Sequence, residues 1–387
     1  MEGSDRRQPA AADVRSFVTE LYGHDMHAKR VESLAGATLG VMQAGSLAVA
    51  LIGQALAQAR GLVTKHAVKQ VDRMLSNHGI DVWDSLARWI PFQIGERRDI
   101  LVAMDWTEFD HDDQATLVLS MVTGHGRAAP LLWLSVWKDE LKNRRNDFED
   151  ACLRRLVELV PPACRVTILA DRGFGDQKLF AYLAELGFSY VIRFRGNVHV
   201  TDAEGRTKPA AEWVGKGGRA TKLLDARVTA QGRQVGAVVC VHAKDMKEPW
   251  CLATSERDAT AATLINYYAK RWTIEPQFRD TKDLRFGMGL SSTRIGDPMR
   301  RDRLLLVSAF ATALLTLLGA VGESLGMDRL LKSNTSKKRT HSLFRQGCML
   351  YELIPNMPEH RLLPLLAKFA EAIASAGMFT PAIASSK

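Results

Sequence analysis

The sequence has few cysteines and lacks the signature motifs of several large enzyme classes. Its five cysteines (Cys152, Cys164, Cys240, Cys251 and Cys348) form no C-x-x-C pair, so neither a disulfide framework nor a structural zinc site is expected. No P-loop, G-x-S-x-G, H-E-x-x-H or G-x-G-x-x-G motif occurs in the 387 residues. The chemistry of this chain must therefore rest on other residues.

Signals for export and membrane insertion are also scarce. The N-terminal segment MEGSDRRQPAAADVRSF has no apolar run of the kind that secretory signals carry, so we expect a reducing, bacterial-type cytoplasm. Residues 304–322 are uncharged and just long enough to cross a bilayer. We interpret them as a buried core helix, with Ser308, Thr312 and Thr316 on one face, and we expect no membrane partner. A membrane-spanning helix is the alternative.

The chain does have an ordinary globular composition and an excess of positive charge. Charged residues make up 25% and hydrophobic residues 46%, which disfavours a fibrous or fully disordered protein. There are 52 Lys and Arg against 43 Asp and Glu, a formal net charge of +9. Residues 328–346 alone carry six basic residues and one acidic residue. The excess favours an acidic partner, and a solvated loop is the alternative for residues 328–346.

The apolar pattern divides the chain into five regions. They are a helical DNA-binding region at 1–95, a core part at 96–195, a β-rich insertion at 196–256, a second core part at 257–300 and a helical region at 301–387 that is a candidate for dimerisation. Within the first region, Thr64–Ser76 predicts a basic amphipathic helix suited to DNA. A solvated helix is the alternative for that segment.

The first core part predicts strands and helices in the order β-β-β-α-β-α-β. Strands are expected at 99–109, 116–123, 128–137, 165–170 and 189–194, and helices at 144–159 and 176–186. Short polar turns between the first three strands predict an antiparallel meander. With a helix after the insertion, the order predicts an α/β fold. Its ribonuclease-H-like mixed-sheet core is interrupted by a β-strand-rich insertion and flanked by helical N- and C-terminal regions.

Three acidic residues stand out by position. Asp105 lies inside the apolar first strand, on the face of Ala103 and Thr107, where an unpaired carboxylate is costly. Asp171 follows the fourth strand, at the strand end where ligands gather in such sheets. Turn-capping roles are the alternative for both. With Glu275 from the later helical segment, these carboxylates suit divalent metal ions that serve phosphoryl transfer.

The segment around Glu275 predicts a mixed stripe of side chains. The stripe consists of Tyr268, Arg271, Glu275 and Lys282, with Arg279 beside it. In a continuous helix the first four lie within an arc of about 60°. Pro276 complicates this, because proline kinks or breaks a helix interior. A solvated face with ion pairs is the alternative.

These residues resemble those of a known family. The spacing is Tyr268-x2-Arg271-x3-Glu275-x6-Lys282, similar to the Tyr-Arg-Glu-Lys motif of bacterial insertion-sequence transposases of the insertion-sequence-four type. Asp105 in MDWTEF and Asp171 in ILADRGF resemble the first two acids of that family. Its members are DDE transposases with a ribonuclease-H-like core, and the resemblance covers about residues 98 to 283.

The resemblance implies an enzyme that cuts DNA at insertion-sequence ends and joins the freed 3′-OH ends to target DNA. Asp105, Asp171 and Glu275 would be catalytic and would hold two Mg²⁺ ions, for which Mn²⁺ would substitute. The implied partners are double-stranded DNA, as terminal inverted repeats and as target, and a second copy of the chain in a homodimer on paired ends. The implied location is the bacterial nucleoid.

The resemblance also implies DNA contacts, to which we add Arg279 from its place near the stripe and Arg172 because it follows Asp171. The expected contacts are Tyr268, Arg271, Lys282, Trp250, Arg279 and Arg172. Trp250 resembles a tryptophan that stacks on a flipped base in hairpin-forming members. A core strand residue is the alternative interpretation of Trp250, and Trp213 is the second candidate for the stacking role.

Two other functions stay open. A ribonuclease-H-like nuclease would share the three acids and would cleave DNA without joining it. A non-catalytic DNA-binding protein derived from a transposase would bind DNA without cutting it.

Overall fold

The computed structural model describes residues 11–229 and 231–374, so parts of the regions 1–95 and 301–387 and most of the segment judged for a secretory signal lie outside it. The α-helices are α1 (Ala11–Tyr22), α2 (Ala28–Ala44), α3 (Val49–Arg60), α4 (Thr64–Leu75), α5 (Val82–Ile94), α6 (Arg145–Leu159), α7 (Gln177–Glu185), α8 (Ala261–Lys270), α9 (Ile274–Lys282), α10 (Pro298–Ser324), α11 (Leu343–Leu353) and α12 (Glu359–Ala374). The strands are β1 (Asp99–Phe109), β2 (Gln114–Val122), β3 (Ala128–Trp137), β4 (Arg165–Ala170), β5 (Ser189–Phe194), β6 (His199–Thr201), β7 (Thr207–Pro209), β8 (Thr221–Leu224), β9 (Arg227–Val228), β10 (Arg233–Gln234), β11 (Ala237–Val241) and β12 (Trp250–Thr254).

A large mixed sheet forms the centre of the molecule, in the order β3-β2-β1-β4-β5-β12-β11-β8. β1, β2 and β3 pair antiparallel, which confirms the predicted meander, and β4 and β5 continue parallel to β1. The strands form where continuous apolar runs end at polar turns, so β1, β3, β4 and β5 occupy the expected ranges. The α/β class is confirmed by this sheet and its helices.

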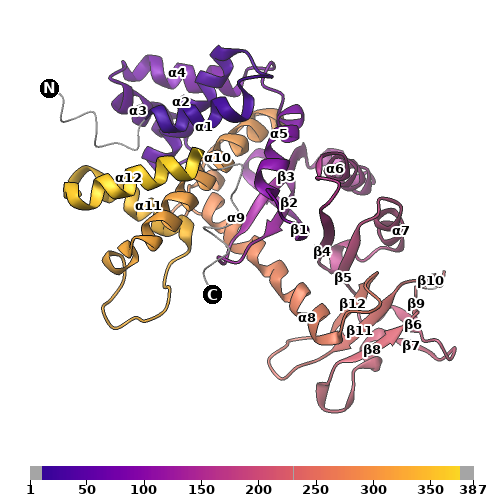
Figure 1. Cartoon of the computed structure of the whole chain (residues 1–387). Helices are drawn as coiled ribbons and strands as arrows, with labels where there is room; N and C mark the ends of the chain where they lie inside the picture. The colour runs from indigo at the N-terminus through magenta and orange to yellow at the C-terminus, as the bar shows by residue number, and fades with distance from the viewer. Residues whose placement is uncertain (1–10, 230, 375–387) are drawn as a thin grey trace.

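The strands of residues 196–256 belong to two sheets. β12 pairs antiparallel with β5, and β11 and β8 follow, so these strands extend the central sheet (Figure 1). β6, β7, β9 and β10 form a second, four-stranded sheet. The apolar runs of β11 and β12 are almost entirely buried, and a strand of that kind needs a partner on each edge. The edge of β5 supplies one.

Helices cover the two faces of the central sheet. On one face of β1, Trp106 Nε1 donates a 2.8 Å hydrogen bond to Glu149 of α6. On the other face, Lys282 of α9 donates to Thr107 Oγ1 at 2.9 Å. Ile274 of α9 packs on Ala103 on that face. Because side chains alternate along a strand, α9 lies on the face that also carries Asp105.

The long apolar helix α10 runs through the core, as expected for residues 304–322. Asp297 caps its N-terminus by accepting from the Arg300 backbone N–H at 3.0 Å. α10 packs on α2, α11, α12 and β3, and Figure 1 shows it crossing beneath the N-terminal helices. Among the described residues it is the one single helix long and apolar enough to span a bilayer, and 83% of its apolar window is buried inside the protein. A helix covered on all sides by its own chain fits the core interpretation.

The N-terminal helices join this core through an aromatic cluster. Phe17 and Tyr22 of α1 and Trp89 of α5 contact Phe310 of α10, with ring centroids 5.3 to 6.0 Å apart. α4 turns its apolar face inward and exposes its basic side chains, as expected for an amphipathic helix.

Candidate active site

Strand register brings Asp105 and Asp171 together. β1 and β4 are parallel, and the last pair of their register is Met104 with Ala170. Asp105 and Asp171 are the residues that follow this pair along β1 and after β4. Because neighbouring strands lie about 4.8 Å apart, the two backbones run side by side at these residues. Asp171 also closes the following turn, because its Oδ1 accepts from the Gly173 N–H at 2.7 Å. A side chain at Gly173 would meet Asp171 Oδ1 at 3.0 Å, so this turn favours glycine.

The Asp105 carboxyl lies in a low-dielectric, electronegative environment. Burial raises its pKa to about 6, and the nearby carboxylates of Asp171 and Glu275 act in the same direction. Arg271 and a 2.9 Å hydrogen bond from the Trp106 backbone N–H to Asp105 Oδ1 oppose the rise in pKa. Asp105 thus carries a charge that its surroundings do not fully compensate.

The stripe segment is helical, but the helix is interrupted. α8 ends at Lys270, a 3-10 turn covers Arg271–Thr273, and α9 begins at Ile274. The interruption places Pro276 in the first turn of α9, where its missing N–H is not needed by the helix. This explains how a proline can follow Glu275 directly while the segment remains helical overall.

Arg271 connects two of the three predicted acids. Its Nη1 lies 3.3 Å from Asp105 Oδ2, and its Nη2 lies 3.6 Å from Glu275 Oε1. The side chain is buried, and Nε has no hydrogen-bond partner among the described residues. In this structure the guanidinium is therefore the cation between the carboxylates, held by long contacts rather than by a bidentate pair.

The two later basic residues of the stripe differ from each other. Lys282 Nζ is tied to β1, donating to Thr107 Oγ1 at 2.9 Å and to the Glu108 carbonyl at 2.7 Å, and burial lowers its pKa. Arg279 is exposed, and its side chain makes no hydrogen bond or ion pair within the described residues. Glu275, Arg279 and Lys282 line one open hollow of about 500 Å³.

Tyr268 and Trp250, the two aromatic residues expected to contact DNA, pack against each other. Tyr268 is 2% exposed, and its ring meets that of Trp250 edge-on with centroids 4.8 Å apart. Burial raises the pKa of the Tyr268 hydroxyl. Trp250 is half-buried at the start of β12 and packs on the core cluster under α8. Trp213 is buried, and its indole N–H donates to the Val200 carbonyl at 3.3 Å.

Arg172 follows Asp171 but turns to another partner. Its Nη1 lies 2.9 Å from Oε2 of Glu248. Arg193 Nη2 forms a second ion pair with the same carboxylate, 3.0 Å from Oε1. Both Arg172 and Glu248 are half-exposed. The structure thus brings Asp105, Asp171, Glu275, Arg271 and Tyr268 together and places Arg172 beside them in a separate ion pair.

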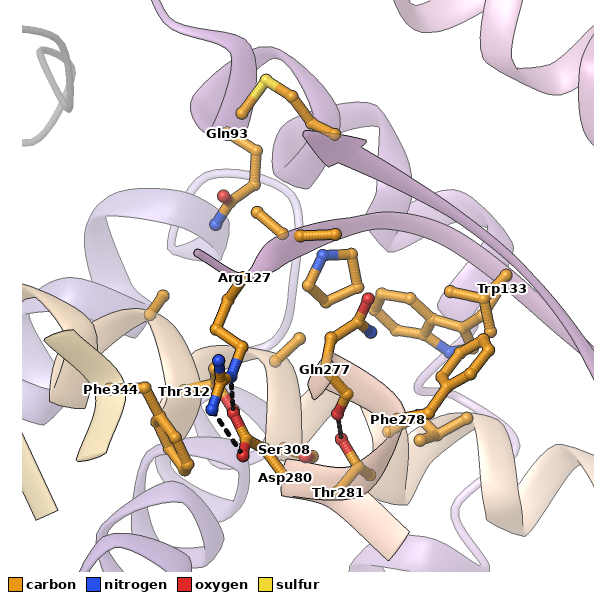
Figure 2. A pocket seen from close by; sticks show the side chains of 18 of the residues that line it. Gln93, Arg127, Trp133, Gln277, Phe278, Asp280, Thr281, Ser308, Thr312 and Phe344 are labelled. Atoms are coloured by element: carbon orange, nitrogen blue, oxygen red, sulfur yellow. Dashed lines mark hydrogen bonds and ion pairs between the residues drawn. The ribbon is translucent and has the colours of Figure 1, made fainter. Parts of the chain in front are cut away.

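Several residues that shape the site were not singled out by sequence. Gln277 accepts from Ser120 Oγ at 2.8 Å and holds α9 on β2. Arg127, in the turn between β2 and β3, forms an ion pair with the buried Asp280 of α9, and Figure 2 shows this pair at a cavity beneath α9. Asp280 and Gln277 lie on the inner face of the helix, so the helical period was a usable signal for both.

The donor set fits a hard cation, although the three acids stand apart here. Carboxylate oxygens are the ligands that Mg²⁺ prefers, and Asp105 has the carboxylates of Asp171 and Glu275 near enough to raise its pKa further, beyond the effect of burial. No group of three His, Cys, Asp or Glu side chains within residues 11–229 and 231–374 is arranged closely enough to hold a metal ion. Arg271 lies between Asp105 and Glu275 instead.

Comparison with protein families identifies part of the chain. Residues 141–311 match the family model described as the transposase DDE domain. The match contains Asp171, Arg271 and Glu275, whereas Asp105 lies before its start. A search of curated proteins found no match. Over residues 141–311 the chain is thus similar to transposase DDE domains, and this stretch includes two strands of the mixed sheet that precede the insertion, β4 and β5.

Proposed function

We propose that the protein is a metal-dependent DDE transposase that cuts DNA at the ends of an insertion sequence and joins the 3′-OH ends to target DNA. The observation that carries the proposal is the placement of Asp105 beside Asp171 by strand register, with Asp105 and Glu275 both facing the guanidinium of Arg271. The match to the transposase DDE domain over residues 141–311 supports it. The core is proposed to be ribonuclease-H-like, and the working form to be a cytoplasmic homodimer on paired ends.

Asp105, Asp171 and Glu275 would hold the metal, proposed as two Mg²⁺ ions with Mn²⁺ as a substitute. Bound Mg²⁺ would lower the pKa of an attacking water or 3′-OH and offset charge on the phosphate oxygens. Asp105 and Asp171 are fixed by the sheet and by the Gly173 turn, whereas Glu275 stands on a helix that begins one residue earlier. The rigid pair positions the site, and α9 brings the third carboxylate.

Arg271 and Lys282 would orient the scissile phosphate. Arg271 has weak contacts to carboxylates in the DNA-free protein, so an incoming phosphodiester offers its guanidinium a stronger, bidentate partner. Lys282 is already fixed by β1 and would act as a placed positive charge. Transfer of Arg271 to the phosphate would also free Asp105 and Glu275 for metal.

The test uses purified protein and a labelled duplex that carries the gene's own flanking ends. We expect nicking at an end followed by joining in Mg²⁺ or Mn²⁺, neither in EDTA, and neither with Glu275→Gln. The variant should still bind the duplex, because it removes one carboxylate charge and leaves the cations in place.

The same assay separates the other functions. Cleavage without any joining would identify a nuclease, and tight binding without cleavage would identify a non-catalytic DNA-binding protein. Full cleavage by Glu275→Gln would remove that residue from the mechanism.

A further inference from the structure

A basic hollow lies beside the acid site, at the far end of the catalytic helix α9. It has a volume of about 390 Å³ and is lined by side chains from α9, the β2–β3 turn and the start of α11. Its charged lining residues are Arg127, Arg279, Arg345 and Asp280, with His341 beside them. Since Asp280 is paired with Arg127, two guanidinium charges are left without an acidic partner.

Those two guanidiniums are available for a ligand. The side chains of Arg279 and Arg345 are both exposed, and neither makes a hydrogen bond or ion pair within the part of the chain that the structure describes. Both lie near enough to lower the pKa of the Asp280 carboxyl, although burial raises it more.

The walls of the hollow are held in place by structural bonds. Arg339 pairs with Glu323 at the end of α10, and Gln346 donates to the same carboxylate at 2.8 Å. These bonds fix the start of α11, where Ser342 caps the helix and no acidic residue occupies the first turn. Of the basic residues at 328–346, Lys332 and Arg339 serve the fold, and Arg345 faces the hollow.

The basic hollow adjoins the open hollow that is lined by Glu275 and Lys282. Arg279 lines both, and it lies one helical turn beyond Glu275, a rise of about 6 Å along α9. Phe286 stands on the opposite rim with its side chain 61% exposed. An exposed aromatic ring next to guanidiniums suits a nucleotide better than a free phosphate ion, because bases and sugars pack on rings.

Resting on the proposed function, we propose that Arg127, Arg279 and Arg345 form a cradle for a backbone phosphate of the same DNA whose scissile phosphate lies at Glu275. Arg279 and Arg345 would bind the phosphate oxygens directly, and Arg127, held by Asp280, would add positive charge behind them. Phe286 would pack on the adjoining sugar or an unpaired base. The cradle fixes the path of the strand along α9.

The test compares Arg345→Gln with Arg361→Gln, which removes the same charge from an exposed arginine of α12 outside the hollow. Binding of the labelled end duplex is measured over a series of salt concentrations. We expect Arg345→Gln to weaken binding several-fold and to reduce the slope of log K against log salt by about 0.9, the value for one lost phosphate contact. Arg361→Gln should leave both quantities at the wild-type value.

A second arm identifies the source of the phosphate. Inorganic phosphate alone is added to the wild type and to Arg345→Gln, and thermal unfolding is followed. The cradle proposal predicts little stabilisation of either protein. Phosphate-dependent stabilisation that only the wild type shows, with an unchanged DNA salt slope in Arg345→Gln, would assign the hollow to a free phosphate.

The outcomes also separate this inference from the proposed function. Equal DNA binding by Arg345→Gln and Arg361→Gln, with cleavage intact, overturns the cradle and leaves the transposase proposal standing. Absence of DNA binding by the wild type overturns both.

Discussion

Charged side chains gather at the start of α10 and around Asp105 of β1, but their partners differ. In α10, Arg301 is fully buried and bonds Asp112 and Gln114, and Arg303 donates to the carbonyls of Ile80 and Leu75 at 2.8 and 2.9 Å. Asp302 accepts from the Ser135 N–H at 3.0 Å. Each charge there has a short bond to another element.

Around Asp105 the contacts between charged groups are longer, and carboxylates outnumber cations. One guanidinium, that of Arg271, faces Asp105 and Glu275 at 3.3 and 3.6 Å, and Asp171 adds a third carboxylate nearby. A buried cluster that only supports the fold is most stable when each charged group has a hydrogen-bonded partner. A site that binds a cation and a phosphate needs charged groups that are not already fully paired. The same residue types thus serve stability in one place and ligand binding in the other.

The largest expected effect on stability comes from breaking the α10 cluster. Arg301→Leu leaves the buried Asp112 carboxylate without its cation, and we expect a loss of about 3–5 kcal/mol in the free energy of unfolding. Chemical denaturation measures it. The control is Arg165→Leu, which breaks an exposed pair with Asp99 and should cost about 0–1 kcal/mol. Similar losses in both variants would contradict the structural role assigned to Arg301.

A smaller effect is expected from removing the guanidinium at the acid site. Arg271→Met deletes two weak contacts to carboxylates, and we expect a loss of about 1–3 kcal/mol. Unlike Arg301→Leu, this variant should regain stability in millimolar Mn²⁺, because a cation can replace the guanidinium. Thermal unfolding with and without Mn²⁺ gives the answer. An equal response to Mn²⁺ in Arg271→Met and Arg301→Leu would remove the distinction between the two clusters.

The last effect is a gain in stability that depends on pH. The folded-state pKa of Asp105 is raised from 3.8 to about 6, so the folded protein holds this proton more tightly than the unfolded chain. Stability is therefore lost as pH rises from about 4 to about 6, and Asp105→Asn removes that loss. We expect the variant to be more stable than the wild type at pH 7, by up to about 3 kcal/mol, because folding raises the pKa of Asp105 by about 2, and equally stable near pH 4. A difference that does not change with pH would show that Asp105 is not the group responsible.

The sequence predicted the central elements because their signals are local. Apolar runs that end at polar turns give β1, β3, β4 and β5 within their observed bounds. The sequence also placed Asp105 and Asp171 at strand positions, and parallel register then makes them neighbours. These positions could be predicted because side-chain alternation and the order of strands can be inferred from one sequence.

Contacts between segments that are far apart in the sequence could not be predicted in this way. The strands of the insertion join the edge of β5, a choice set by which edge is left unpaired after the core has formed. Arg127 and Asp280 are far apart in sequence, and nothing local in the turn GHGR indicates its partner. The contact of Arg271 with Glu275 follows from their i, i+4 spacing in the motif, whereas its contact with Asp105 follows from the position of α9 on the sheet, which the motif does not reveal.

The most direct test of the central claim is metal binding at the acid site. Mn²⁺ is titrated into the complex of protein and end duplex, and free Mn²⁺ is measured by electron paramagnetic resonance. The wild type and Glu149→Gln, which changes a buried acid on the opposite face of β1, should bind Mn²⁺ alike, and Asp105→Asn should bind it much more weakly. Equal Mn²⁺ binding by Asp105→Asn and the wild type would contradict the account.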